Sequence, residues 1–469
     1  MILTLAEAAL GAGARLEAPA SAQGVGALVA SGYSIDSRTV AAGELFFAVR
    51  GERLDGHDFV VAALEHGAIG AVVSVHRVVS LPNAALAAPL LIVEDPLIAL
   101  QTLAAHVRRQ WGKRVVGVTG SAGKTSTKEA VAAVLAAEFP VLKSLGNLNN
   151  GFGLPLQLLR LEPEHEYAVI EMGMNHSGEI AQLCRIAAPD WGVVTNVGMA
   201  HVENFPDGQA GIARAKYELI ESLPPNGVAF LNCDDRYVSQ FGRDFPGKTV
   251  YFGAGPCSDP LIAAVREGDQ LEIDLVSEGR EATLKLSLLG RHNAVNAAAA
   301  IAVGQEAGVP LDAAIHALEQ LTPGDKRGQI LHLHGATIIN DAYNSNPEAL
   351  KAMILTLTAR PATRRILVAG EMLELGDFAA ELHADCGRAA AEARVDVIVG
   401  VRGHAADLVR GVTEAAVPGV ATIFLHDADA AGEWLKENLR TGDVVLVKGS
   451  RGVRLERAID ALMSHDDAN

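Results

Sequence analysis

Short apolar segments rich in valine, isoleucine and alanine recur along the whole chain, and most end at glycine, asparagine or a charged residue. They alternate with longer stretches in which apolar residues recur every three or four positions. The short runs predict buried strands, and the longer pattern predicts amphipathic helices. Strand–helix alternation of this kind predicts an α/β protein with mostly parallel sheets that carry helices on both faces.

Residues 1–110 form the first predicted unit, a small α/β domain. Its strand candidates are ELFFAV, IGAVVSV and PLLIVED, and its longest helical pattern is PLIALQTLAAHVRRQ. That helix leads directly into the strand candidate that begins at Arg114. We therefore place the first domain boundary at residues 110–111.

Residues 111–322 and 323–469 form two further α/β units. The central unit has the strand candidates RVVGV, EYAVIEMG, DWGVVTNVG and GVAFLNCDD, followed by the helical stretches RHNAVNAAAAIAVGQEAG and PLDAAIHALEQL. The segment LTPGDKRGQ, rich in turn formers and charge, marks the second boundary. The last unit has strand-to-loop transitions at ATIINDAYNSNP, RRILVAGEM, VDVIVGV, VATIFLH and DVVLVKGSRG, with helices at AAELHADCGRAAAEA and AAGEWLKENL. This pattern predicts a doubly wound, Rossmann-like domain, whose ligands bind beyond the carboxyl ends of the strands.

Composition narrows the function classes. The net charge of −17 argues against nucleic acid or an anionic membrane surface as the main partner. No apolar run reaches the ~18 residues needed to cross a bilayer, and MILTLAEAALGAG lacks the basic start of a signal peptide. The four cysteines, Cys184, Cys233, Cys257 and Cys386, have no metal-type spacing, so we expect unpaired thiols in a reducing compartment. These features predict a cytoplasmic protein, and nothing in the sequence requires more than a monomer.

The segment TGSAGKTS, residues 119–126, is the strongest chemical signal. It follows a strand and opens a helix, as a phosphate-binding loop does. Glycines let backbone N–H groups approach phosphates, and the helix N-terminus adds positive charge. The strict Walker pattern is not met, because Val118 stands where its first glycine falls. The predicted nucleotide loop comprises Gly120, Ser121, Ala122, Gly123, Lys124, Thr125 and Ser126. The chain has no Asn-Lys pair, which disfavours a GTP-dependent switch.

Two further strand ends carry candidate metal ligands. Glu171 ends EYAVIE and is placed to hold the same Mg²⁺ as Thr125. His201 follows the strand of VVTNVGMAH, where contact with a ligand or substrate is expected. Lys216 lies in the amphipathic stretch GIARAKYELIESL, and its spacing alone indicates a surface cation.

These segments together resemble the Mur ligase family of peptidoglycan synthesis. The resemblance rests on TGSAGKT, GNLNNGFGLPL, IEMG, TNVGMAH, ARAKYE and RHNAVNAAAA, and on SIDSRTVAAGELFFAVRGERLDGHDF near the N-terminus. It extends to the C-terminal unit and so covers all three predicted domains. It implies that residues 1–110 bind a UDP-sugar substrate, residues 111–322 bind ATP, and residues 323–469 bind ATP and an incoming amine.

The resemblance also implies a reaction. ATP phosphorylates a carboxylate, an amine attacks the acyl phosphate, and an amide forms with release of ADP and phosphate. Asn149-Asn150, DAYNSNP and VKGSRG resemble the members that join D-alanyl-D-alanine to UDP-N-acetylmuramoyl-tripeptide. The Asp-Asn-Pro-Arg string expected of the ligase that acts one step earlier is absent. That ligase, a folate polyglutamate ligase and a slow nucleotide switch remain the alternatives.

Site roles follow from the same resemblance. Lys124, His201 and Lys216 are the expected catalytic residues, and Lys216 is expected to be carbamylated. Two Mg²⁺ ions are expected on Thr125, Glu171, His201 and the Lys216 carbamate. The expected nucleotide contacts outside the loop are Asn296 to adenine, Arg327 to the γ-phosphate and Asp341 to the ribose. The expected substrate contacts are Ser37, Arg38, Asn149, Asn150, Asn344, Asn346, Ser450 and Arg451, with Gly56-His57-Asp58 a weaker candidate. Turn, cap or surface roles are the alternatives for several of these residues.

Overall fold

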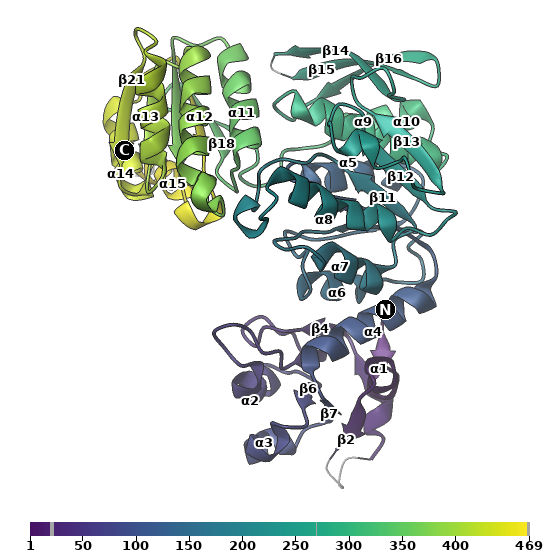
Figure 1. Cartoon of the computed structure of the whole chain (residues 1–469). Helices are drawn as coiled ribbons and strands as arrows, with labels where there is room; N and C mark the ends of the chain where they lie inside the picture. Colours follow the sequence, from purple (N-terminus) through teal and green to yellow (C-terminus); the bar gives the residue numbers. More distant parts are fainter. Residues whose placement is uncertain (19–22, 269, 467–469) are drawn as a thin grey trace.

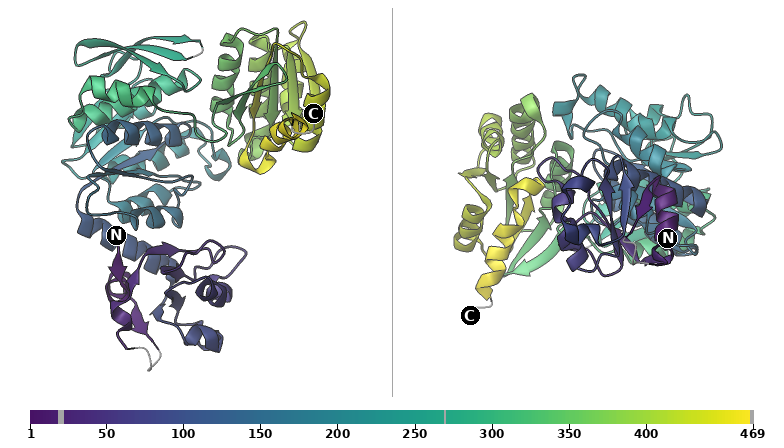
Figure 2. Two further views of the ribbon diagram at one scale, coloured as in Figure 1. Left: turned by 180° about the vertical axis from the view of Figure 1, so that it is seen from behind. Right: turned by 90° about the horizontal axis from the view of Figure 1, so that it is seen from below.

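The computed structural model describes residues 1–18, 23–268 and 270–466. The chain forms three α/β parts (Figure 1). The N-terminal part lies at one end of the central part, and the C-terminal part lies beside the central part, as the view from behind also shows (Figure 2). The α/β class and the parallel sheets predicted for the central and C-terminal parts are confirmed.

The N-terminal part is built on a mixed sheet with the order β2-β7-β6-β5-β4. Strands β4 to β7 are parallel, and β2 pairs antiparallel with β7 at one edge. A small ribbon pairs β1 (Leu3–Thr4) with β3 (Val29–Ala30). The sheet strands are β2 (Arg15–Glu17), β4 (Gly32–Ser34), β5 (Glu44–Phe47), β6 (Gly70–Ser74) and β7 (Leu90–Val93); the helices are α1 (Leu5–Ala12), α2 (Val60–Glu65), α3 (Asn83–Leu86) and α4 (Pro96–Trp111).

Helix α4 connects this part to the central one. The Asp95 side chain caps it, proline occupies its first position, and Gly112 ends it in the left-handed conformation. It packs against α1 on one side and against α6 (Gly153–Leu158) and α7 (Glu179–Ala187) on the other. The buried Arg108 donates hydrogen bonds to the carbonyls of Ala187 and Ala188. The helix is therefore shared by both parts.

The central part is built on an all-parallel sheet with the order β13-β12-β11-β8-β10-β9. Successive residues of β8, Val115 and Val116, enter different hydrophobic cores, so helices cover both faces. From β8 the chain runs to β9 and back to β10 on one side of β8, and it then crosses to β11 on the other side, which makes the carboxyl end of β8 the topological switch point. The strands are β8 (Arg114–Thr119), β9 (Val141–Lys143), β10 (Tyr167–Glu171), β11 (Trp191–Val194), β12 (Val228–Asn232) and β13 (Lys248–Phe252); the further helices are α5 (Lys124–Ala136), α8 (Gln209–Glu221), α9 (His292–Glu306) and α10 (Leu311–Glu319).

An antiparallel meander, absent from the sequence prediction, joins β13 to α9. It comprises β14 (Leu261–Glu267), β15 (Leu271–Ser277) and β16 (Arg280–Leu286). Strand β15 alternates buried and half-buried residues along its whole length. Its sequence, LEIDLVS, carries that period of two.

The expectation of unpaired cysteines is wrong for one pair. Cys233 and Cys257 form a disulfide, whereas Cys184 and Cys386 are free and buried. Cys233 follows β12, and Cys257 lies in the loop after β13. Because β12 and β13 are adjacent parallel strands, the loops that follow them leave the sheet at the same edge and meet.

The C-terminal part is a doubly wound sheet with the order β17-β18-β22-β19-β20-β21, in which only the β17–β18 pair is antiparallel among the described strands. Helices α12 and α13 pack together beside α11, and α14 packs with α15. The strands are β17 (Gln329–Leu333), β18 (Ala336–Asp341), β19 (Arg364–Gly370), β20 (Val397–Val401), β21 (Ala421–Leu425) and β22 (Asp443–Lys448); the helices are α11 (Pro347–Ala359), α12 (Ala379–Glu392), α13 (Ala405–Ala415), α14 (Ala428–Asn438) and α15 (Glu456–Asp466).

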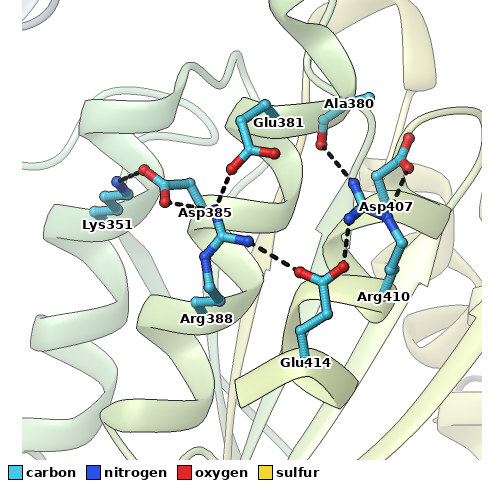
Figure 3. Close-up of polar contacts among 8 residues, drawn as sticks. All are labelled: Lys351, Ala380, Glu381, Asp385, Arg388, Asp407, Arg410 and Glu414. Atoms are coloured by element: carbon cyan, nitrogen blue, oxygen red, sulfur yellow. Dashed lines mark hydrogen bonds and ion pairs between the residues drawn. The ribbon is translucent and has the colours of Figure 1, made fainter.

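An ion-pair network ties α11, α12 and α13 together on the outer surface (Figure 3). Arg388 bonds to Asp385 at 2.8 Å and reaches Glu414 of α13 at 3.0 Å. Lys351 of α11 donates to Asp385 at 2.9 Å. These partners are partly exposed and satisfy one another, so the network holds helices together rather than presenting a binding site.

Candidate active site

The predicted nucleotide loop lies at the switch point, between the end of β8 and the start of α5. Gly120 and Gly123 have φ of 152° and 80°. A Cβ on Gly120 would lie 1.8 Å from Oγ1 of Thr195, and one on Gly123 would lie 2.8 Å from Oδ1 of Asn296. Only glycine fits these two positions, because both the backbone conformation and the neighbours exclude a side chain.

The loop after β11 braces the nucleotide loop. Asn196 forms two hydrogen bonds with Ala122: the Ala122 N–H donates to Oδ1 at 2.9 Å, and Nδ2 donates to the Ala122 carbonyl at 3.0 Å. Thr195 Oγ1 donates to the same carbonyl at 2.7 Å. The Ser121 hydroxyl accepts from the N–H of Gly198 at 2.8 Å. Ser121 and Asn196 therefore hold the loop in shape.

Lys124 folds back over the loop that it follows. Its Nζ donates to the carbonyl of Gly120 at 2.7 Å. Burial lowers the pKa of Lys124; Glu171 opposes that shift and the Arg327 cation of the C-terminal part adds to it. An ammonium held at the mouth of a glycine loop is placed to meet phosphate oxygens.

Glu171, at the carboxyl end of β10, is buried and meets two of the predicted site residues. Thr125 Oγ1 donates to Oε2 at 2.9 Å, and Asn149 Nδ2 donates to Oε1 at 2.7 Å. Thr125 and Glu171 come together because their strands, β8 and β10, are parallel neighbours. Their hydroxyl and carboxylate oxygens are the ligand type that Mg²⁺ prefers.

Sequence reasoning missed a buried lysine behind this carboxylate. Lys128 of α5 is completely buried and donates to the Ser144 carbonyl at 2.7 Å, while Glu129 pairs with it at 2.9 Å. The Ser144 hydroxyl accepts from the backbone N–H of Glu171 at 3.1 Å. Lys128 thus holds Ser144 in place, and Ser144 in turn positions the backbone of Glu171. A lysine in the first turns of a helix has the sequence signature of a solvated residue, so only the structure identifies this role.

Lys216 lies on the buried face of α8 and is 3% exposed, so the surface alternative is wrong. Among the described residues its Nζ has no hydrogen bond or ion pair. Burial lowers its pKa well below the ordinary value, and the Lys124 cation lowers it further. The side chain is therefore suited to the neutral amine form, which is the form that reacts with CO₂.

His201 lies in the loop after β11 with a φ of 64°. Its Nδ1 is 2.6 Å from Oε2 of Glu374 in the C-terminal part. In residues 1–18, 23–268 and 270–466, no three His, Cys, Asp or Glu side chains gather into a metal site. Glu171 and His201 therefore need oxygens from other sources, such as phosphates or a carbamate, to complete an Mg²⁺ coordination shell.

The C-terminal part contributes a second polar group of residues. The Arg327 guanidinium lies 3.8 Å from the centre of the Tyr343 ring. Asp341, at the end of β18, pairs with the buried Nζ of Lys448 at 2.6 Å. Lys448 also donates to the Asn344 carbonyl at 2.9 Å. Lys448 ends the neighbouring strand β22, a strand-end signal to which sequence reasoning assigned no role.

Several other residues that were predicted to contact the nucleotide or the substrate form hydrogen bonds or ion pairs with groups of the protein itself. The Asn346 side chain caps α11, and the Asn150 side chain accepts from the N–H groups of Phe152 and Gly153 at the start of α6. The Ser450 hydroxyl accepts from the N–H of Leu373 at 3.0 Å. Arg451 pairs with Glu456 at 2.5 Å. The buried Asn296 bonds to Thr127 and Asn293 behind the nucleotide loop, so it is not the surface residue that the alternative interpretation predicts.

The N-terminal candidates lie around the loop after β4. Ser37 is buried, and its carbonyl contacts Nδ1 of His66 at 2.6 Å. Arg38 is exposed and binds Asp36 through two nitrogens, which lowers the pKa of that carboxyl to about 2. Both ring nitrogens of His57 are engaged, one by Asp55 and the other by the N–H of Ser74. His57 is therefore a structural residue of this part.

Within the described part of the chain, no helix is both long enough and apolar enough to cross a membrane. Three family profiles match the chain: Mur ligase family, catalytic domain, over residues 29–145; Mur ligase middle domain over 118–304; and Mur ligase, glutamate ligase domain, over 326–451.

Individual relatives match almost the whole chain. The UDP-N-acetylmuramoyl-tripeptide–D-alanyl-D-alanine ligase of Bacillus subtilis is 36% identical over 437 residues, which is 93% of each chain. The crystal structure of MurF from Acinetobacter baumannii superposes with a TM-score of 0.87 at 29% identity and covers 99% of both chains. The MurF ligase of Thermotoga maritima in complex with ADP gives a TM-score of 0.80 at 30% identity, over 94% of this chain and 98% of its own.

Proposed function

The chain belongs to the Mur ligase family, and we propose that it joins D-alanyl-D-alanine to UDP-N-acetylmuramoyl-tripeptide in an ATP-dependent reaction of peptidoglycan synthesis. The observation that carries the proposal is similarity at 36% identity along 93% of the chain to a ligase of that name. A nucleotide loop that meets a buried carboxylate at the switch point supports it independently. ADP bound to the related Thermotoga maritima ligase supports ATP as the nucleotide.

The reaction needs a carboxylate to become electrophilic. Phosphoryl transfer from ATP supplies a leaving group, and the catalyst's task is positioning and charge neutralisation. Loop N–H groups and Lys124 hold the phosphates. Arg327, which acts electrostatically on Lys124, faces the same phosphates from the C-terminal part. Phosphoryl transfer releases ADP and forms an acyl phosphate. The α-amino group of the dipeptide then attacks the carbonyl carbon, loses a proton and expels phosphate, giving the amide.

Thr125, Glu171, His201 and Lys216 fit the two expected Mg²⁺ ions. Mg²⁺ at this position would neutralise phosphate charge during transfer. Asn149 and Thr125 each bond to one oxygen of Glu171, and each oxygen keeps a second lone pair that can bind a metal ion. Lys216 fits carbamylation, because its buried amine has no partner in the described part of the chain and its pKa is depressed. A carbamate would convert this buried neutral amine into an anionic ligand.

The remaining contacts are proposed by similarity. We assign the UDP-sugar to residues 1–110 around Ser37 and Arg38, ATP to residues 111–322, and the dipeptide to residues 323–469. Asn149 and Asn150 are assigned to the UDP-linked substrate, Asn296 to adenine and Asp341 to ribose. Asn344, Asn346, Ser450 and Arg451 are assigned to the dipeptide. We propose that the chain acts as a monomer in the cytoplasm, where ATP is available.

Phosphate release from ATP tests the proposal. The purified chain is given UDP-N-acetylmuramoyl-tripeptide with D-alanyl-D-alanine, with single amino acids, or with neither. Release that requires both the UDP-tripeptide and the dipeptide supports the proposal. A preference for a free amino acid on a shorter UDP-peptide would assign the enzyme to an earlier step, and activity without any UDP substrate would favour a folate-type ligase. The Lys124→Ala variant is the control for contaminating phosphatases.

A further inference from the structure

A loop of the C-terminal part reaches the proposed metal site of the central part. The sequence Gly370–Gly376, GEMLELG, continues from β19 and leads into the short helix η6 (Gly376–Phe378). Helix η6 packs against η4 (Val202–Asn204), which begins directly after His201. The proposed reaction assigns no role to this loop.

Glu374 of this loop meets the imidazole of His201. Oε2 of Glu374 lies 2.6 Å from Nδ1 of His201. The carboxylate lies within bonding distance of Nδ1 but off the direction of a regular N–H hydrogen bond, and it favours the neutral tautomer with the proton on Nδ1. In the described part of the chain, Nε2 of His201 has no hydrogen-bond partner. One ring nitrogen therefore faces a carboxylate while the other remains available.

Both partners adopt a backbone conformation that disfavours their side chains. His201 and Glu374 have φ of 64° and 65°. Non-glycine residues in this region cost free energy and collect at functional sites. Gly376, with φ of 52°, allows the two loops to approach closely, because a Cβ there would lie 2.7 Å from Cβ of Glu203. Both loops are thus shaped to bring the carboxylate to the imidazole.

A second glutamate touches the same loop without touching the imidazole. Oε1 of Glu348, in the first turn of α11, accepts from the N–H of Met199 at 2.9 Å. The C-terminal part therefore docks on the central loop through two carboxylates. Only one of them, Glu374, is placed to act on a metal ligand.

We propose that Glu374 is a positioning residue for His201: it pairs with Nδ1 and thereby directs the Nε2 lone pair to the proposed Mg²⁺ site. Histidines that bind metals commonly hold a carboxylate on the other ring nitrogen, which fixes the tautomer and the ring orientation. The inference rests on the proposed function, in which His201 is a metal ligand. Because Glu374 belongs to the C-terminal part, docking of that part and metal affinity become linked.

Manganese binding tests the inference. Mn²⁺ replaces Mg²⁺ as an oxygen- and imidazole-binding ion that electron paramagnetic resonance detects, and it is titrated into the full chain with the βγ-methylene analogue of ATP. The His201→Ala and Glu374→Ala variants should each lower the affinity of the weaker Mn²⁺ site about 10-fold or more. Glu374→Asp, which keeps the carboxylate, should recover part of the loss. Glu348→Ala is the matched control that weakens docking and leaves the carboxylate on the imidazole.

A second readout follows the imidazole itself. In protein labelled with ¹⁵N-histidine, the His201 resonances are assigned with a His201→Gln variant. The wild-type ring should show the proton on Nδ1, and Glu374→Ala should move it to Nε2. Glu348→Ala should leave the ring unchanged.

The outcomes separate the inference from the proposed function. Unchanged Mn²⁺ affinity in His201→Ala would remove His201 from the metal site and overturn the inference, whereas the proposed function is decided separately by the phosphate-release assay. A loss in His201→Ala with none in Glu374→Ala would overturn the inference alone. Equal losses in Glu374→Ala and Glu348→Ala, with no change of tautomer, would also overturn it, because docking would then explain the effect.

Discussion

Replacing Lys216 by methionine should make the protein inactive and more stable. The substitution keeps the length of the side chain and removes a buried amine, since only 3% of the residue is exposed. In the described part of the chain no partner satisfies the amine, and the Lys124 cation disfavours its charged form. Lys216 therefore lowers the stability of the folded protein.

The size of the effect follows from burial. A buried polar group without a hydrogen-bond partner costs about 1–3 kcal/mol, a cost that an apolar side chain of similar volume does not carry. In a unit of about 200 residues, each kcal/mol raises the melting temperature by about 2–4 °C. We therefore expect the transition that includes the central part to move up by about 2–12 °C at pH 7.

The difference should shrink as the pH rises. The pKa of Lys216 is depressed in the folded protein, so between that pKa and the ordinary lysine pKa of 10.5 the unfolded chain binds more protons than the folded chain. Wild-type stability consequently increases with pH across this window, and the Lys216→Met variant lacks this contribution. Bicarbonate should stabilise only the wild type, because a carbamate can form only on the lysine of the folded state.

Calorimetry at pH 7 and pH 9.5, with and without bicarbonate, checks these expectations. Lys248→Met is the control: Lys248 is an exposed lysine of the same part, paired with Glu306, and its loss should change stability by no more than about 0.5 kcal/mol. A Lys216→Met protein that melts at or below the wild type at both pH values would refute the reasoning.

Three further substitutions test the site and the fold. Asn149→Ala removes a hydrogen bond to the Glu171 carboxylate worth about 1.5–3 kcal/mol, so kcat/KM should fall about 10- to 150-fold. The Mg²⁺ concentration that gives the half-maximal rate should rise. A higher KM for the UDP substrate with no change in the Mg²⁺ dependence would contradict this role of Asn149. Arg327→Ala should lower kcat about 100-fold with ADP affinity nearly unchanged in titration calorimetry, as expected of a group that meets developing charge; an equal loss in ADP affinity would argue for ground-state binding. Gly411→Ala would place a Cβ 2.0 Å from the Ala384 carbonyl and should lower the free energy of unfolding by about 1–3 kcal/mol in urea titrations; an unchanged midpoint would mean that α12 and α13 separate easily.

Much of the fold was predictable because strands and helices differ in period. The parallel strands that end at Thr119 and Glu171 were recognisable as apolar runs, and parallel neighbours bring such ends together. The meander of β14–β16 was missed although LEIDLVS alternates strictly. The pairing of Cys233 with Cys257 depends on which strands are neighbours, and the order of strands in the sheet is not visible in local sequence.

Site residues were predictable where the backbone dictates their role. Gly120 and Gly123 belong to a loop whose shape requires them. Lys128 and Glu374 were not predicted, because a buried lysine on a helix and a loop glutamate have the same local sequence as solvated residues. Their roles arise from contacts between segments that are distant in the chain.

Helix α4 has a consequence for substrate choice. It is a single uninterrupted element of 16 residues, about 24 Å long at 1.5 Å per residue, and it is packed against both the N-terminal and the central parts. The nucleotide-sugar pocket proposed in the N-terminal part and the phosphate loop of the central part are thereby held at a fixed spacing. A peptide that is one residue shorter would therefore place its carboxylate short of the γ-phosphate, even when its sugar is fully bound. Selection for peptide length then follows from the fixed distance between the two sites, and it needs no side chain that recognises the missing residue.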